Sequence, residues 1–127
     1  METLLGERLD RAIAAKDAEA LVALLSPDID FRAMTPGSFW EATTTHAVVA
    51  DVILGQWFED SDRIEAIESI SAGDDVEDLH RVAYRFRVRN DDGRYTVEQQ
   101  AYYDVKDDQI DYLRIICSGY RPIGPAT

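Results

Sequence analysis

The sequence predicts an α+β domain in which three helices lie on one face of an antiparallel sheet. Apolar residues recur at helical spacing near the N-terminus, and they alternate with polar residues over three long segments of the second half. Short turns rich in Asp and Gly separate these segments. A chain of 127 residues fits one domain, so we expect residues 1–127 to fold as one unit.

Two helices are predicted at the N-terminus. From Glu2 to Ala15 the apolar residues are spaced as one stripe of a helix, which consists of Leu5, Leu9, Ala12 and Ile13. Asp17 can cap a second helix that continues to Leu25. Pro27 follows closely, and proline cannot continue a helix.

A short strand and a third helix follow. Apolar and polar residues alternate from Ile29 to Ala33, which predicts a strand before the turn residues 35–38. Thr44 or Thr45 can cap a helix that reaches Trp57. Residues 63–72 are ambiguous because isoleucine recurs every three residues, as in a helix. The turn at residues 73–75 and the strands after it favour a strand there.

Three further strands are predicted over Leu79–Arg89, Tyr95–Val105 and Ile110–Gly119. A three-residue loop at 91–93 would place Phe86 opposite Glu98, and a two-residue loop at 107–108 would place Glu98 opposite Cys117. Cross-strand partners share a face of the sheet. The inner face predicted by this register consists of Val82, Tyr84, Phe86, Val88, Glu98, Gln100, Tyr102, Leu113, Ile115 and Cys117.

The other face of this predicted sheet is rich in arginine. This face is either exposed to solvent or a polar dimer interface. It carries amphipathic area that suits self-association, so we expect a homodimer through the sheet face. The apolar and aromatic residues that this register places there are Tyr95, Val97, Tyr103, Tyr112 and Ile116.

The formal charge of −12 makes nucleic acid and anionic lipid surfaces unlikely partners, because both are bound through basic patches. No apolar run approaches the roughly 20 residues that cross a membrane, and the N-terminus does not resemble a secretory signal. We therefore expect a soluble cytoplasmic protein. The single cysteine excludes an intramolecular disulfide and zinc-finger spacing.

The helix pair, the strand and turn, the helix ending in GQWF and the segment VEQQAYYDVKDDQIDYLRIICSGYRP together resemble the SnoaL-like branch of the nuclear transport factor 2-like superfamily. The resemblance covers nearly the whole chain. It implies a cone in which a strongly curved antiparallel or mixed sheet wraps around three helices and leaves a pocket at the wide end. It also implies a homodimer. The superfamily includes isomerases, cyclases, dehydratases and epoxide hydrolases as well as non-enzymes, so fold does not determine function.

Glu98 is the candidate catalytic residue. An unpaired buried carboxylate is costly, so Glu98 either borders a water- or ligand-filled pocket or has a partner. Burial beside Phe86 would raise its pKa and suit it to general acid or base catalysis. The alternative is a structural carboxylate bonded to a tyrosine, a backbone N–H or an arginine.

Eight other residues are candidate ligand contacts. Tyr84, Gln100 and Tyr102 could hydrogen-bond to a ligand oxygen, or they could be satisfied polar groups of the core. Trp40 and Trp57 could stack on a flat ligand or serve only in packing. In this register Cys117 lies beside Glu98. A carboxylate raises the pKa of a neighbouring thiol and disfavours nucleophilic chemistry, so we interpret Cys117 as a small residue of the pocket wall. The full set is Phe31, Trp40, Trp57, Tyr84, Phe86, Gln100, Tyr102 and Cys117.

Three functions are consistent with these patterns. The first is a binding protein with an internal pocket for a small, largely apolar ligand. The second is a cofactor-independent isomerase, cyclase, dehydratase or hydrolase that uses Glu98. The third is a structural dimer whose pocket is filled by side chains. No cofactor motif is present, and His80 near Asp104 and Asp111 is better interpreted as a surface ion pair than as a metal site.

Overall fold

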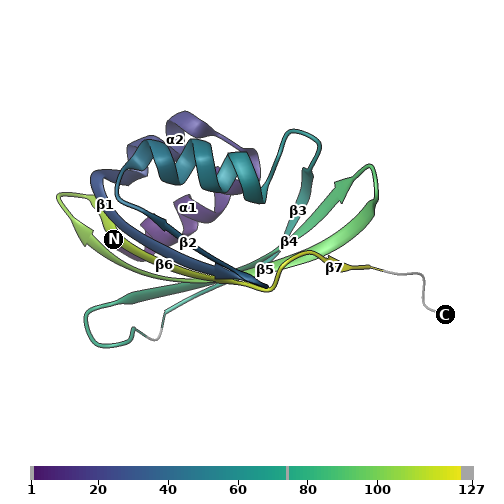
Figure 1. Cartoon of the computed structure of the whole chain (residues 1–127). Coiled ribbons are helices and arrows are strands. Elements are labelled where there is room, and N and C mark those ends of the chain that lie inside the picture. Colours follow the sequence, from purple (N-terminus) through teal and green to yellow (C-terminus); the bar gives the residue numbers. More distant parts are fainter. Residues whose placement is uncertain (1, 74, 124–127) are drawn as a thin grey trace.

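The computed structural model describes residues 2–73 and 75–123. The described chain begins with two helices, continues through two strands and a wide helix, and ends in a series of strands (Figure 1). The elements are α1 Glu2–Ala15, α2 Ala18–Leu24, β1 Leu25–Thr35, β2 Ser38–Ala42, η1 Ala47–Trp57, β3 Arg63–Ala72, β4 His80–Asn90, β5 Gly93–Lys106, β6 Gln109–Cys117 and β7 Arg121–Pro122.

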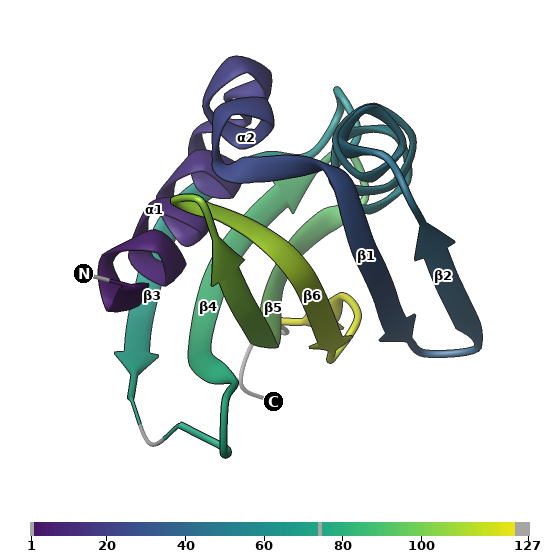
Figure 2. The same ribbon diagram turned by 90° about the vertical axis from the view of Figure 1, so that its left-hand side faces the viewer.

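The strands of the described chain form one mixed sheet in the order β2-β1-β6-β5-β4-β3, with the short β7 paired to β5. Strands β1 and β6 are parallel, and the other pairs are antiparallel. The sheet is strongly curved, and the three helices lie on its concave side (Figures 1 and 2). The predicted α+β class with a curved mixed sheet is confirmed.

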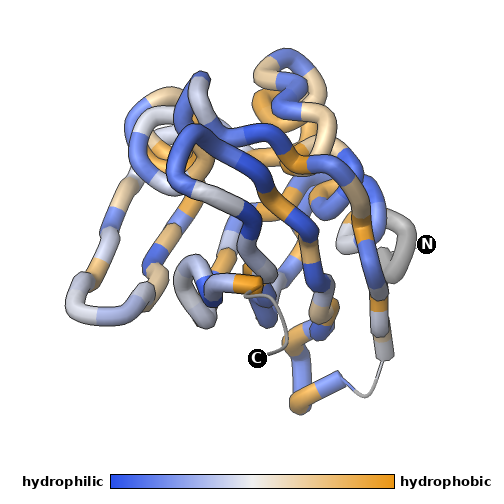
Figure 3. Tube along the Cα trace, turned by 90° about the vertical axis from the view of Figure 1, so that its right-hand side faces the viewer, coloured by the Kyte–Doolittle hydropathy of each residue, from blue (hydrophilic) through white to orange (hydrophobic). Residues whose placement is uncertain are grey.

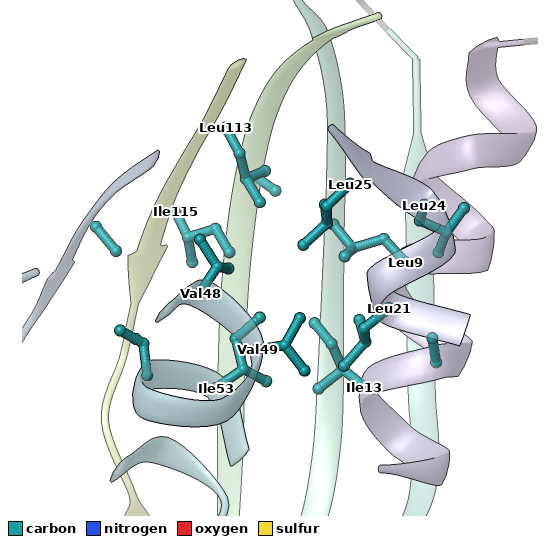
Figure 4. Close-up of a cluster of buried hydrophobic side chains, with 14 of the residues drawn as sticks. Leu9, Ile13, Leu21, Leu24, Leu25, Val48, Val49, Ile53, Leu113 and Ile115 are labelled. Atoms are coloured by element: carbon teal, nitrogen blue, oxygen red, sulfur yellow. The ribbon is translucent and has the colours of Figure 1, made fainter. Parts of the chain in front are cut away.

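The N-terminal helices form where the apolar stripe and the cap predict them. The Asp17 carboxylate accepts a hydrogen bond of 3.1 Å from the Ala20 N–H, and α2 ends at Leu24. The stripe of α1 is buried against the sheet and against α2, because only one face of the helix is apolar. Figure 4 shows the core that results, in which Leu9 and Ile13 meet side chains of α2, η1 and β6.

The third helix is a π-helix rather than an α-helix. Its N–H groups bond five residues back, as the 2.9 Å bond from Phe58 N–H to Ile53 O illustrates. Of the two predicted capping threonines, Thr44 accepts a hydrogen bond of 3.2 Å from the Ala47 N–H. The Thr45 hydroxyl instead donates to Ser26 O, which ties the start of η1 to β1.

The ambiguous segment at residues 63–72 is strand β3. Its pairing with β4 shifts at two places, between Ile64 and Ala66 and between Ile67 and Ser69. Each bulge adds one residue to β3, so consecutive inward side chains are three positions apart instead of two. The helix-like spacing of the isoleucines therefore arises from two bulges in a strand.

The predicted register of β5 is wrong by one residue against each of its neighbours, β4 and β6. Asn90 pairs with Gly93, so the first hairpin has a two-residue loop and Phe86 lies opposite Val97. The second turn pairs Lys106 with Gln109 as predicted, but the register then shifts between Asp104 and Val105. Because side chains alternate across a sheet, each one-residue error moves every β5 side chain to the opposite face.

The faces of the neighbouring strands are as predicted, because the two errors cancel between β4 and β6. Tyr84, Phe86, Leu113 and Ile115 are all buried on the concave side. Along the strands, hydrophobic and hydrophilic residues alternate closely (Figure 3). None of the helices formed by residues 2–73 and 75–123 has the length and apolarity to cross a membrane.

Candidate functional site

A pocket of about 360 Å³ opens at one end of the curved sheet. Its walls come from the β1–β2 turn, the end of η1, the middle of β5 and the segment after β6. The lining residues are Thr35, Pro36, Trp40, Gln56, Trp57, Phe58, Val97, Gln99, Cys117, Ser118, Gly119, Tyr120 and Arg121.

Aromatic rings form much of the wall. Trp40 meets Trp57 edge to face with ring centroids 6.3 Å apart, and Phe31 supports Trp57 from the core at 6.0 Å. The Trp40 indole N–H donates a hydrogen bond of 2.8 Å to Thr35 Oγ1, which fixes the ring against the β1–β2 turn. The wall therefore offers flat apolar surfaces held in defined orientations.

Gln99 is the buried polar residue of the wall. It has no solvent-exposed surface, and its Oε1 accepts a hydrogen bond of 2.7 Å from the Tyr84 hydroxyl. Its Nε2 has no hydrogen-bond partner among the described residues, and neither does the buried indole Nε1 of Trp57. Within the described chain, two hydrogen-bond donors of the lining thus have no partner, and native proteins rarely leave such groups unpaired.

Tyr120 closes another side of the pocket and stays neutral. Its hydroxyl donates a hydrogen bond of 2.7 Å to Trp57 O, which links the segment after β6 to the end of η1. Burial, followed by the nearby Asp62 carboxylate, raises the pKa of Tyr120 well above its usual value. Within the described part of the chain, the only charged lining residue is Arg121, and no carboxylate lines the pocket.

Glu98, the predicted catalytic residue, is on the wrong side of the sheet. It lies opposite Arg85 on the convex face, and Glu98 Oε1 accepts hydrogen bonds of 3.0 and 2.7 Å from that guanidinium. Half of its side-chain surface is exposed to solvent. The predicted inner position of Glu98 is therefore wrong, because β5 is shifted by one residue against β4.

Because of the same shift, the predicted inner positions of two candidate ligand contacts are also wrong. Gln100 and Tyr102 also lie on the convex face, where the Gln100 amide donates to the Tyr102 hydroxyl. Their places on the concave side are taken by Gln99, Ala101 and Tyr103, all of them buried. The sequence interpretation missed Gln99 for this reason alone.

The remaining predicted residues are on the concave side, but only some line the pocket. Trp40, Trp57 and Cys117 are in its wall. Phe31, Tyr84 and Phe86 are fully buried behind it. Cys117 lies opposite Gln99, and its sulfur accepts a weak hydrogen bond of 3.4 Å from the Gly119 N–H. The roles of these residues as ligand contacts stay predictions.

Part of the lining lay outside the sequence prediction. Phe58 and Tyr120 pack ring to ring at 6.2 Å, and both reach the pocket from segments beyond regular elements. Periodicity gives no signal for such positions. Across residues 2–73 and 75–123, no group of three or more His, Cys, Asp or Glu side chains is arranged to hold a metal ion. His80 contacts Asp75 at 3.4 Å instead of Asp104 or Asp111.

The sequence was compared with models of protein families, and the matching family is consistent with the observed fold. A model described as a SnoaL-like domain matches residues 7–113. The chain belongs to the SnoaL-like family. No curated protein matches the sequence of this SnoaL-like domain.

Solved structures similar to this SnoaL-like domain share its fold at low sequence identity. A candidate isomerase from Bacillus subtilis has a TM-score of 0.70 at 11% identity, covering 88% of this chain and 84% of that one. A candidate polyketide cyclase from Pseudomonas putida has a TM-score of 0.68 at 16% identity, covering 89% and 88%. An LEH-like epoxide hydrolase from M. tuberculosis has a TM-score of 0.63 at 15% identity, covering 93% and 86%.

Proposed function

We propose that this SnoaL-like domain binds a small, largely apolar organic molecule in the 360 Å³ pocket, and that an acceptor oxygen of the ligand meets Gln99. The observation that carries the proposal is the Gln99 side chain. It is fully buried in the wall, it is held from behind by Tyr84, and its Nε2 has no partner among the described residues.

The energetics favour a hydrogen-bond acceptor over a purely apolar ligand. A buried donor without a partner costs about 1–3 kcal/mol, so a ligand oxygen that meets Gln99 Nε2 supplies the partner that this group lacks among the described residues. Trp57 Nε1 is a second unsatisfied donor of the same lining. A carbonyl oxygen could accept a hydrogen bond from either donor.

The rest of the lining favours a flat, apolar body. Ring faces of Trp40 and Trp57 suit a flat molecule, and no carboxylate among the described lining residues would form an ion pair with a ligand. Similar folds carry the names of an isomerase, a polyketide cyclase and an epoxide hydrolase, which all imply small organic molecules. Glu98 has no part in this proposal, since it is ion-paired on the other face.

Two probes of matched shape test the proposal. We expect 2-acetylnaphthalene to bind more tightly than 2-isopropylnaphthalene, which has nearly the same shape but no acceptor, as measured by isothermal titration calorimetry. Gln99→Leu should reduce the preference for the ketone by roughly 3- to 10-fold, the value of one neutral hydrogen bond. Gln100→Leu is the matched control on the convex face and should leave the preference unchanged. Equal affinities of the two probes for the wild-type protein would refute the role of Gln99.

We also propose that the domain forms a homodimer through the convex sheet face. An uncharged row crosses this face from the edge strand β2, and Phe39 in it is 80% exposed. A hollow of about 450 Å³ beside it offers room for a partner side chain. The row, in order of strand pairing, is Phe39, Met34, Ile116, Gln100 and Ala83.

A second copy of the chain is the partner that this face fits. The chain carries a net charge of −12, so two copies repel each other over most of their surface. The convex face is more balanced, because its arginines are paired with carboxylates, as in Arg32–Glu41 at 3.6 Å and Arg114–Asp30 at 3.1 Å. A two-fold contact here buries the uncharged row and keeps like charges apart.

A further inference from the structure

The pocket wall contains the one cysteine of the chain. Cys117 is the last residue of β6, it is half-buried, and it lines the pocket together with Gln99. The two residues lie directly opposite each other on β6 and β5. Side chains of directly paired residues share a face of the sheet, with their Cβ atoms about 4.5–5.5 Å apart. The sulfur and the buried amide therefore border the same part of the pocket.

The surroundings of the sulfur suit a thiolate. The Gly119 N–H donates a hydrogen bond of 3.4 Å to Cys117 Sγ, and such a bond strengthens when its acceptor carries negative charge. Glu98, which would repel a thiolate, is paired with Arg85 on the opposite face of the sheet. Among the described lining residues the charged one is Arg121, and its charge is positive. No charge of the described lining therefore opposes a thiolate.

Gln99 supplies a second group for chemistry at the sulfur. Its side chain has no exposed surface, and the Tyr84 hydroxyl holds its Oε1 at 2.7 Å. Its Nε2 has no partner among the described residues. A fixed donor of this kind stabilises a reaction most when negative charge develops on the oxygen that it contacts. Addition of a thiolate to a conjugated ketone develops such a charge on the ketone oxygen.

We propose that Cys117 is a nucleophile that adds to α,β-unsaturated ketones bound in the pocket, with the ketone oxygen on Gln99 Nε2. This inference rests on the proposed function and narrows its ligand class to conjugated ketones. The oxygen and the β-carbon of such a ketone belong to one short planar system, so two neighbouring residues contact both ends. The planar system also suits the ring faces of Trp40 and Trp57.

The addition balances without an oxidant, a reductant or a further reactant. The Cys117 thiol loses its proton to water, and an electron pair of the sulfur forms a bond to the β-carbon of the ligand. The π electrons of the double bond move toward the ketone oxygen, where the Gln99 N–H stabilises the negative charge. Water returns a proton to the α-carbon. One S–H bond and one C=C π bond are exchanged for one S–C and one C–H bond, and the product is a thioether.

The test uses 2-naphthyl vinyl ketone, which is 2-acetylnaphthalene with a vinyl group in place of the methyl group. Intact-protein mass spectrometry measures the rate of addition, and iodoacetamide measures the general accessibility of the same thiol. We expect the ratio of the vinyl ketone rate to the iodoacetamide rate to be roughly tenfold or more higher for Cys117 than for free N-acetylcysteine. Excess 2-acetylnaphthalene should slow the addition of the vinyl ketone, because it occupies the same pocket.

Three variants separate the roles of the residues. Gln99→Leu should lower the vinyl ketone rate roughly 10- to 100-fold, the value of a hydrogen bond to a charged group. It should leave the iodoacetamide rate unchanged, because displacement of iodide develops no charge on a carbonyl oxygen. Gln100→Leu is the matched control on the convex face and should keep both rates. Cys117→Ser should abolish the adduct.

Equal rate ratios for Cys117 and N-acetylcysteine would overturn the inference, and so would a vinyl ketone rate that Gln99→Leu leaves unchanged. If Gln99→Leu does not fold, the rate ratio and the protection by 2-acetylnaphthalene in the wild-type protein decide the question. If 2-acetylnaphthalene binds in calorimetry while the rate ratios are equal, this inference fails and the proposed function stands. If 2-acetylnaphthalene does not bind, the proposed function fails, and the rate ratio still decides the role of Cys117.

Discussion

The Tyr84 hydroxyl donates a hydrogen bond of 2.7 Å to Gln99 Oε1 between two adjacent strands, at a point that solvent does not reach. This contact orients the one buried amide of the pocket wall. It also provides a partner for a group that would otherwise be costly to bury.

We predict that Tyr84→Phe lowers the free energy of unfolding by about 1–3 kcal/mol, because it leaves Gln99 Oε1 buried without a donor. Urea denaturation measures the change. Tyr102→Phe is the matched control, since Tyr102 is half-buried on the convex face, and it should cost less than about 0.5 kcal/mol. Equal losses in the two variants would contradict the prediction.

Asp10 is a carboxyl group of α1 buried in the core, and it should make stability fall as the pH rises. Its pKa is about 7 in the folded chain against 3.8 for an ordinary Asp, so the folded state holds a proton that the unfolded state has lost. Stability from this group is complete below about pH 3.8 and is lost as the pH rises to about 7, by up to roughly 4 kcal/mol.

The difference between wild type and Asp10→Asn isolates this effect from the other carboxylates. Relative to the wild type, the variant should gain stability as the pH is raised from about 4 to about 8, in urea denaturation at each pH. A difference that does not change with pH would show that Asp10 does not titrate in this window.

Glu98→Gln should leave the pocket unaffected. The carboxylate is half exposed and paired with Arg85, and such surface pairs contribute about 0–1 kcal/mol. We expect 2-acetylnaphthalene to bind this variant with wild-type affinity in calorimetry. A loss of affinity of tenfold or more would mean that the convex face communicates with the pocket.

The position of Glu98 shows how far hairpin turns alone determine register. The sequence predicted the three helices, the strands β1 and β3–β6 and the inner faces of β4 and β6, because periodicity reports on each element separately, but it did not predict the short strands β2 and β7. Register depends on one residue in each loop, and the hydrophobic periodicity gives no signal for the two-residue loop before Gly93 or for the shift at Asp104.

Cross-strand charges would have given the correct register of β5. The observed pairing places Glu98 opposite Arg85 and Val97 opposite Phe86, whereas the predicted pairing placed Glu98 opposite Phe86. Opposite charges and apolar pairs that face each other stabilise a sheet, so the observed register is better by both criteria. The residues after Cys117 lie outside any periodic element, and only the folded chain brings them to the pocket.

Gly119 and Gly37 form a matched pair for testing the pocket wall. Both have a positive φ, +76° and +81°, so alanine is strained at each by about 1 kcal/mol. A Cβ at Gly119 would also lie 2.8 Å from Pro36 Cγ, whereas a Cβ at Gly37 would meet nothing within 4 Å. Gly119→Ala should therefore lower the thermal midpoint more than Gly37→Ala. Equal shifts would show that Pro36 moves away freely.

Phe39→Asp should dissociate the proposed homodimer. The substitution places a charge in the uncharged row of the convex face, where Phe39 is the most exposed large apolar residue. Burying an unpaired carboxylate in an interface is costly, so the dimer dissociation constant should rise roughly tenfold or more in analytical ultracentrifugation. Val22→Asp is the matched control, because Val22 is an exposed apolar residue on α2. A wild-type chain that sediments as a monomer would refute the dimer, and equal effects of both substitutions would place the interface elsewhere.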